Sequence, residues 1–235
     1  MRILAIESSA KSASCALLRD GELEAANYQN VGLTHSQTLM PMIESMMKNA
    51  GRTMADVDIV AASHGPGSFT GVRIGVSTAL GLAAGADKPS MGVSTLEAMS
   101  RLTAHTGALT LCAMDARRSE VYAAMFLDGE RLCDDCAVPA SEFAARAAET
   151  AKKLGKSVIC LGDGAELCYN QIKDSGVEAR LAPPHLLRQS AVGVAMLAAD
   201  RLSAGENVPP PPLRPVYLRA SQAERMKKER EQNQN

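Results

Sequence analysis

A short polar sequence, Glu7-Ser8-Ser9, follows the first apolar run of the chain. Residues 2–9 have the composition of a strand, so these polar residues lie in the loop that ends it. Hydroxyls and backbone amides in such a loop can hold a phosphate group. We therefore predict nucleotide binding at Glu7, Ser8 and Ser9, with an ordinary turn as the alternative.

A glycine-rich sequence, HGPGSFTGVRIG at residues 64–75, follows the fourth predicted strand. It lacks the Lys-Ser or Lys-Thr pair of a P-loop and the spacing of a dinucleotide-binding fingerprint. Ser68 is instead predicted to cap a helix that runs to about Gly85. Each glycine inside a helix costs about 1 kcal/mol relative to alanine, which a chain tolerates where another backbone comes very close. Four glycines fall in this helix: Gly71, Gly75, Gly81 and Gly85.

Two helices are predicted to form a partner-docking or dimer surface. The first covers residues 34–50, begins with a capping box of Thr34 and Gln37, and carries several methionines, which suit an adaptable surface. Ordinary core filling is the alternative for this stripe. The second, residues 68–85, has almost no polar face, so it is either buried in its own domain or covered by a partner. The predicted interface residues are His35, Leu39, Met42, Ile43, Met46, Gly71, Val72, Gly75, Val76 and Ala79.

The remaining elements alternate between strands and helices, which predicts an α/β fold with mixed sheets flanked by helices. We expect one domain over residues 1–107, a second over 108–220 and a polar, mobile tail over 221–235. The expected strands are 2–9, 12–19, 22–29, 57–62, 89–93, 109–114, 120–127, 131–138, 157–161 and 177–181. The further expected helices are 94–106, 141–154 (capped by Ser141), 165–173 and 189–204.

Composition excludes several classes of function. A net charge of −1, 3% aromatic residues and no Trp argue against independent nucleic-acid binding. The N-terminal residues read as a strand and not as a signal peptide, and no apolar run is long enough to span a membrane, so we expect a cytoplasmic protein. The four histidines lie far apart in the sequence, and Cys133 and Cys136 form a lone C-x-x-C. We therefore expect reduced thiols, no metal site and no catalytic residue.

Several sequences together resemble the TsaB (YeaZ) family of bacterial tRNA threonylcarbamoyladenosine synthesis. They occur in the family's order: ILAIESS at 3–9, HSQ at 35–37 before LMP at 39–41, the glycine run at 65–75, GVSTLEA at 92–98, DARR at 115–118 and EVY at 120–122. The closing PVYLR at 215–219 also fits, whereas the middle of the second unit is generic. Glu7 is a departure, because aspartate is common at that position in the family.

The resemblance implies an actin/Hsp70-like (ASKHA) fold of two ribonuclease-H-like halves. It implies a heterodimer with the catalytic paralogue TsaD, which acts with the ATPase TsaE and transfers threonylcarbamoyl to tRNA. TsaD carries an H-x-x-x-H metal pair where this chain has Thr95 and Met99, which are poor ligands for such a metal. The chain is therefore expected to be a non-catalytic scaffold with no intrinsic cofactor, which reaches tRNA only through the complex.

Other interpretations remain open. We also expect that the chain forms a homodimer in the absence of TsaD, and that ATP or another nucleotide contacts it within the complex. An independent small-molecule kinase would use Glu7 and the glycine loop to hold ATP, and a metallopeptidase would bind metal stoichiometrically. We also expect leucine at Gly75 to abolish the heterodimer and leave the monomer folded.

Overall fold

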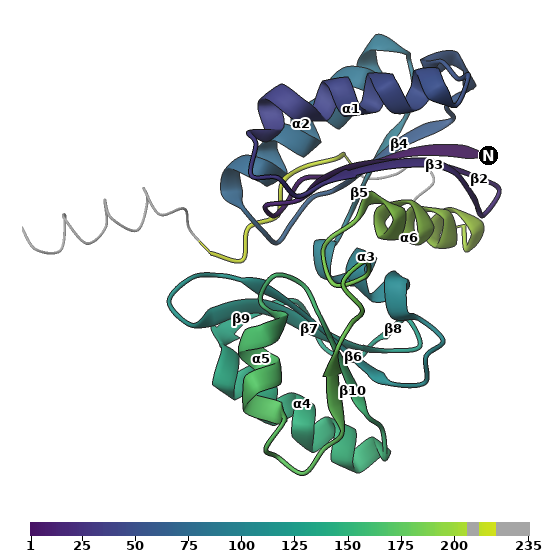
Figure 1. The fold of residues 1–235 in the computed structure, drawn as a ribbon. Coiled ribbons are helices and arrows are strands. Elements are labelled where there is room, and N and C mark those ends of the chain that lie inside the picture. The colour runs from purple at the N-terminus through teal and green to yellow at the C-terminus, as the bar shows by residue number, and fades with distance from the viewer. Residues whose placement is uncertain (206–211, 220–235) are drawn as a thin grey trace, which may run out of the picture.

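The computed structural model describes residues 1–205 and 212–219, so the predicted tail at 221–235 lies outside the described residues. Figure 1 shows two sheets, one above the other, each flanked by helices. None of the helices in the described ranges is long and apolar enough to cross a membrane. The architecture is the predicted α/β arrangement of two mixed sheets.

The first sheet has the order β3-β2-β1-β4-β5. Strands β1, β2 and β3 pair antiparallel, while β4 and β5 continue parallel to β1. Asp20 and Gly21 have positive φ angles of 49° and 87° at the turn between β2 and β3. Such angles suit a tight hairpin turn, as Asp-Gly predicts. The strands are β1 (Arg2–Glu7), β2 (Ala13–Arg19), β3 (Glu22–Gln29), β4 (Ile59–Ser63) and β5 (Ser90–Val93).

Helices cover both faces of this sheet. On one face, α1 (His35–Asn49) and α2 (Phe69–Gly85) share a core with β1, β2 and β4, and a short 3₁₀ helix (Met54–Asp56) lies between them in the sequence. The Ser68 hydroxyl accepts a hydrogen bond from the Gly71 amide, which confirms the predicted cap. Thr34 occupies the N-cap position of α1 but makes no side-chain cap bond, so the predicted capping box is wrong.

The second sheet has the order β11-β10-β6-β7-β8, with β9 paired to β7. Helices α4 (Ala140–Leu154) and α5 (Ala165–Ile172) cover one face of it. Helix α4 begins after Pro139, so Ser141 is not its cap. The predicted strand 131–138 is instead two short strands. The strands are β6 (Leu109–Asp115), β7 (Glu120–Leu127), β8 (Glu130–Arg131), β9 (Cys136–Pro139), β10 (Val158–Leu161) and β11 (Ala179–Leu181).

Two helices join the units. Helix α3 (Thr95–Ser100) is shorter than predicted and continues as a 3₁₀ turn, Arg101–Thr103. Helix α6 (Ala191–Ser203) follows the second sheet in the sequence but packs on the free face of the first. Residues 191–203 were expected in the second domain, 108–220, but α6 belongs to the core of the first unit, whereas the boundary at residue 107 stays a prediction.

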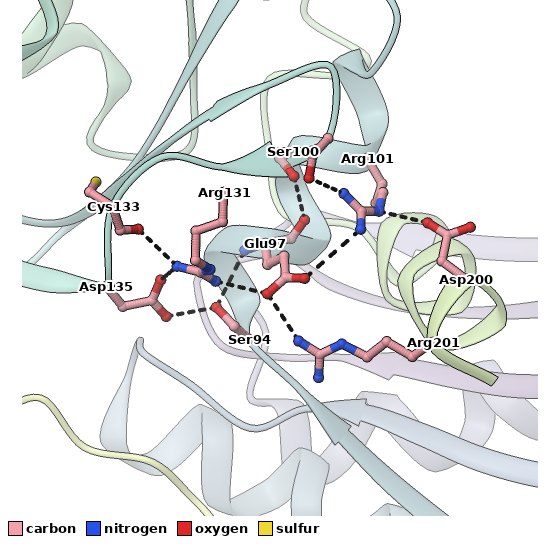
Figure 2. Close-up of polar contacts among 10 residues, drawn as sticks. Ser94, Glu97, Ser100, Arg101, Arg131, Cys133, Asp135, Asp200 and Arg201 are labelled. Carbon is pink, nitrogen blue, oxygen red and sulfur yellow. Dashed lines mark hydrogen bonds and ion pairs between the residues drawn. The ribbon is translucent and has the colours of Figure 1, made fainter. Parts of the chain in front are cut away.

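A cluster of charged side chains reinforces this junction (Figure 2). Glu97 on α3 accepts hydrogen bonds from Arg131 of β8 at 2.9 Å and from Arg201 of α6 at 3.0 Å, and Arg101 lies 3.9 Å away. Burial raises the pKa of Glu97, but the two arginines that donate to it outweigh burial, and its pKa falls below the ordinary value. The carboxylate thus links β8 of the second sheet to α6, which packs on the first sheet.

Candidate functional site

The methionine-rich stripe of α1 points into the protein. Leu39, Met42, Ile43 and Met46 are at most 4% exposed and form part of the core against the first sheet. His35, also predicted at the interface, is half-buried, and its Nε2 lies 2.7 Å from the carbonyl oxygen of Ala10. Core filling is thus the right interpretation of this stripe, and these side chains do not form a surface.

The inner face of α2 is buried in the same core. Val72, Val76 and Ala79 are at most 3% exposed. A Cβ atom at Gly71 would lie 2.1 Å from the carbonyl oxygen of Ser8, and one at Gly75 would lie 2.4 Å from Ser8 Oγ. The predicted close approach is real, but the approaching backbone is the chain's own β1–β2 loop. These five residues therefore serve the fold and not a partner surface.

The opposite side of α2 is open. We call this side the α2 outer face, defined by the exposed residues Arg73, Ser77, Leu80, Gly81 and Ala84. Leu80 is 41% exposed on this face. Apart from the adjacent turns of α2, no atom of the described residues lies within 4 Å of a Cβ built at Gly81 or at Gly85. A partner of this helix would therefore bind the α2 outer face, on the side opposite the predicted residues.

The predicted nucleotide loop is held against α2. Glu7 is 1% exposed and accepts a hydrogen bond from the Ser9 amide at 2.6 Å, and burial raises the pKa of its carboxyl group. The Ser8 hydroxyl donates to the carbonyl oxygen of Gly71 at 2.9 Å. Of the three predicted residues, Ser9 alone lines a cavity. Glu7 and Ser8 thus position the loop.

That cavity is a cleft of about 930 Å³ between the two units. One wall is the β1–β2 loop with the start of α2, and the other includes the β6–β7 turn around Asp115 and Arg117. Asp163, Arg188 and Gln189 also line it. Sequence reasoning missed Arg188 and Gln189, since no motif surrounds them, and it noted Asp115 only as the start of the DARR sequence.

The closing segment, residues 212–219, runs along the cleft. Leu213 is buried in the core of the first unit, and the Val216 amide donates to the carbonyl oxygen of His64 at 2.7 Å. The Tyr217 ring stacks on Phe69 with ring centroids 4.5 Å apart. Arg219 then pairs with Glu120 of β7 in the second unit. The segment therefore connects both units across one side of the cleft.

The positions Thr95 and Met99 are part of the protein interior. They are 0% and 2% exposed, respectively, and neither is among the residues that line the cleft. Within residues 1–205 and 212–219, no three His, Cys, Asp or Glu side chains gather as metal ligands would. Cys133 and Cys136 are half-buried free thiols, and each forms a hydrogen bond with the backbone of β7.

Known proteins share both the sequence and the fold. The family model described as TsaD, tRNA N6-adenosine threonylcarbamoyltransferase, matches residues 29–225. The tRNA threonylcarbamoyladenosine biosynthesis protein TsaB of Escherichia coli (strain K12) is 33% identical over 93% of this chain and 95% of that protein. The TsaB protein of Bacillus subtilis (strain 168) is 31% identical over 95% of this chain and 96% of its own length.

Solved structures agree with the predicted fold class. YeaZ from Pseudomonas aeruginosa has a TM-score of 0.75 at 29% identity, covering 92% of this chain and 99% of that one. The ROK hexokinase from Thermus thermophilus, at 11% identity and a TM-score of 0.53, covers 87% of this chain and all of that one, and shares the fold alone. The two sheets thus form an actin-like ATPase fold. The chain belongs to the TsaD family, among relatives named as TsaB proteins of tRNA threonylcarbamoyladenosine biosynthesis.

Proposed function

We propose that this chain is a non-catalytic, cytoplasmic subunit of bacterial tRNA threonylcarbamoyladenosine synthesis, which activates its paralogue TsaD by docking to it. In this proposal TsaD transfers threonylcarbamoyl from threonylcarbamoyl-AMP to the tRNA adenosine 3′ of the anticodon. TsaE supplies the ATPase activity, and any ATP or other nucleotide is a component of the complex. The chain contacts tRNA only through that complex.

The α2 outer face is the observation that carries this proposal. A long helix with an exposed leucine beside alanine and glycine offers a surface that another helix can approach closely. Its glycines at 81 and 85 weaken the helix and meet nothing within the described residues. The lack of side chains at these glycines would allow a partner helix to pack closely against α2. The same face would join two copies of the chain when TsaD is absent.

The interior position of Thr95 and Met99 supports the non-catalytic part of the proposal. A buried hydroxyl and a thioether are not the ligands that metal-assisted transfer needs. The kinase alternative loses its proposed ATP ligand, because Glu7 is enclosed by the β1–β2 loop. The metallopeptidase alternative requires a metal site that the described residues do not assemble.

Replacing Leu80 with glutamate tests the docking surface. We expect Leu80→Glu to fold normally but to lose co-purification with TsaD, because it introduces a charge at the centre of an apolar contact. Leu154→Glu is the matched control, since Leu154 is 43% exposed on α4 of the other unit. Normal TsaD binding by Leu80→Glu would contradict the proposed surface.

A reconstituted modification assay tests the non-catalytic role. Purified TsaD and TsaE should modify tRNA only when this chain is added, and Leu80→Glu should fail to stimulate them. The chain alone should give no modified adenosine. Turnover by the isolated chain would refute the scaffold role, whereas stimulation by Leu80→Glu would refute only the docking surface.

A further inference from the structure

One arginine of the α2 outer face is held in place by aromatic side chains. Arg73 is the sole charged residue of helix α2, and it is exposed in the second turn. Its guanidinium carbon lies 3.7 Å from the centre of the Phe69 ring, one turn earlier on the helix. Its Nε donates a hydrogen bond to the Tyr217 hydroxyl at 2.8 Å. The ring and the hydrogen bond together fix the plane of the guanidinium group.

The closing segment anchors Tyr217 from both sides along the chain. Before it, the Val216 amide donates to the carbonyl oxygen of His64 at 2.7 Å. After it, Arg219 forms an ion pair with Glu120 of the second unit. The hydroxyl that orients Arg73 is therefore itself held by contacts with both units.

The fixed guanidinium group has no counter-ion. Neither of its Nη groups forms a hydrogen bond or an ion pair with any residue of 1–205 or 212–219. The Tyr217 oxygen accepts from Arg73, so its own proton is also available, and no described residue accepts it. Immobilising an arginine costs side-chain entropy, and here no charged partner on the described chain offsets that cost.

The free donors suit a carboxylate group. A guanidinium group presents parallel N–H donors that match the two oxygens of a carboxylate, and a hydroxyl beside it adds another donor. Helix α2 contains no acidic residue, so it cannot supply that carboxylate itself. Leu80 follows Arg73 by about two helical turns, roughly 10 Å along the axis. A helix that packs along the α2 outer face can therefore contact both residues.

We propose that Arg73 and Tyr217 bind a carboxylate side chain of the partner helix that docks on the α2 outer face. This inference rests on the proposed docking and adds the chemistry of the partner: an aspartate or glutamate about two turns from the residue that packs on Leu80. Val216 and Tyr217 are 43% and 39% exposed, so they continue the docking surface beyond the helix. Arg73 is not among the residues that line the cleft between the units.

Calorimetric titration with TsaD, without tRNA or nucleotide, tests the role of the guanidinium group. Arg73→Gln should fold normally, because the residue is exposed, and should bind TsaD at least about tenfold more weakly. Arg73→Lys should fall between the two, since it keeps the charge but loses the paired donors. Arg180→Gln is the matched control, an exposed arginine on β11 of the second sheet, and should bind normally. Equal affinities of the native chain and Arg73→Gln would overturn the proposal.

Two comparisons separate this inference from the docking itself. If Leu80→Glu loses TsaD binding and Arg73→Gln keeps it, the carboxylate contact is overturned and the docking surface stands; normal binding by both variants overturns both. Reduced tRNA modification by Arg73→Gln at native TsaD affinity would also overturn the carboxylate contact, in favour of a contact with RNA. Added salt should weaken TsaD binding of the native chain more steeply than that of Arg73→Gln, and parallel salt dependences would contradict an ion pair.

Tyr217→Phe tests the hydroxyl while it keeps the ring that stacks on Phe69. We expect TsaD binding to weaken several-fold, with little further loss when the change is added to Arg73→Gln, because the hydroxyl acts together with the guanidinium group. A purely structural hydroxyl would instead lower the stability of the isolated chain and leave TsaD affinity unchanged. That result would overturn the role assigned to Tyr217.

Discussion

The first half and the last half of α2 carry glycine at the same spacing but in different surroundings. Gly71 and Gly75 lie against the Ser8 loop, where a Cβ atom would collide with backbone and hydroxyl oxygen. Gly81 and Gly85 repeat the four-residue interval towards the end of the same helix, where no described residue outside the adjacent turns lies within 4 Å of an added Cβ. A glycine pattern therefore indicates that something can approach the helix, but it does not say whether that is the chain itself or another molecule.

Leucine at Gly71 is expected to have the largest effect. Its Cβ atom would lie 2.1 Å from the Ser8 carbonyl oxygen, a backbone atom that can move only with β1. We expect Gly71→Leu to destabilise the chain by about 3 kcal/mol or to prevent folding. Urea unfolding followed by circular dichroism measures this loss. An unchanged unfolding midpoint would show that the β1–β2 loop is not tightly packed on α2.

The Glu97 cluster is a second contact that serves the fold and not the α2 outer face. Its carboxylate is 15% exposed and accepts from two arginines that belong to different units. Glu97→Gln should therefore cost about 2 kcal/mol at neutral pH by leaving those cations poorly compensated. Docking to TsaD should be unaffected. If Glu97→Gln lost docking to TsaD and kept its stability, the Glu97 cluster would be a partner contact and not a structural one.

The same cluster predicts a pH dependence. Because the pKa of Glu97 is lower in the folded state, its stabilisation is complete above the ordinary glutamate pKa of about 4.3 and is lost as the pH falls below that value. The native chain should thus lose stability more steeply than Glu97→Gln in acid. Unfolding curves of both proteins between about pH 3 and 7 measure the difference. Parallel curves would contradict it.

Alanine at Gly75 should have a smaller and recoverable effect. The obstacle there is Ser8 Oγ at 2.4 Å, a hydroxyl that can rotate away if it gives up its bond to Gly71. Gly75→Ala should cost about 1 kcal/mol in the native background but stabilise a Ser8→Ala background by a similar amount through helix propensity. If the stability changes of Gly75→Ala and Ser8→Ala simply added in the double variant, the two residues would not be in contact. Leucine at Gly75 places the same Cβ atom 2.4 Å from Ser8 Oγ and adds a larger side chain in the core, so we now expect Gly75→Leu to destabilise the monomer as well.

Local patterns predicted most of the elements. The Asp20-Gly21 turn and the Ser68 cap were readable because each depends on residues close together in the sequence. The position of α6 on the first sheet was not, because the packing of an apolar helix is decided by surfaces more than 100 residues away. The strand expected at 131–138 is interrupted near Asp135, whose carboxylate accepts hydrogen bonds from the side chains of Arg131 and Ser94.

The candidate sites were only partly predictable for the same reason. The pattern of α1 and α2 identified the right helices, but periodicity cannot tell a core-facing stripe from a partner-facing one when both are apolar. Ser9 was found because its loop is locally polar. Gln189 reaches the same cleft from the other end of the chain, and a single glutamine before a helix gives no signal of that convergence.

Alanine at Gly81 is the smallest change and the sharpest test of the difference between the two sides of α2. The position is helical with open space around it, so Gly81→Ala should stabilise the isolated chain by about 0.5–1 kcal/mol. If a partner helix packs closely on the α2 outer face, the same methyl group must weaken TsaD binding, because close approach needs the missing side chain. Thermal unfolding of the isolated chain and calorimetric titration with TsaD measure the two effects. Higher stability of the isolated chain together with weaker TsaD binding would place the partner helix at Gly81. Higher stability with unchanged TsaD binding would show that TsaD does not contact this part of α2.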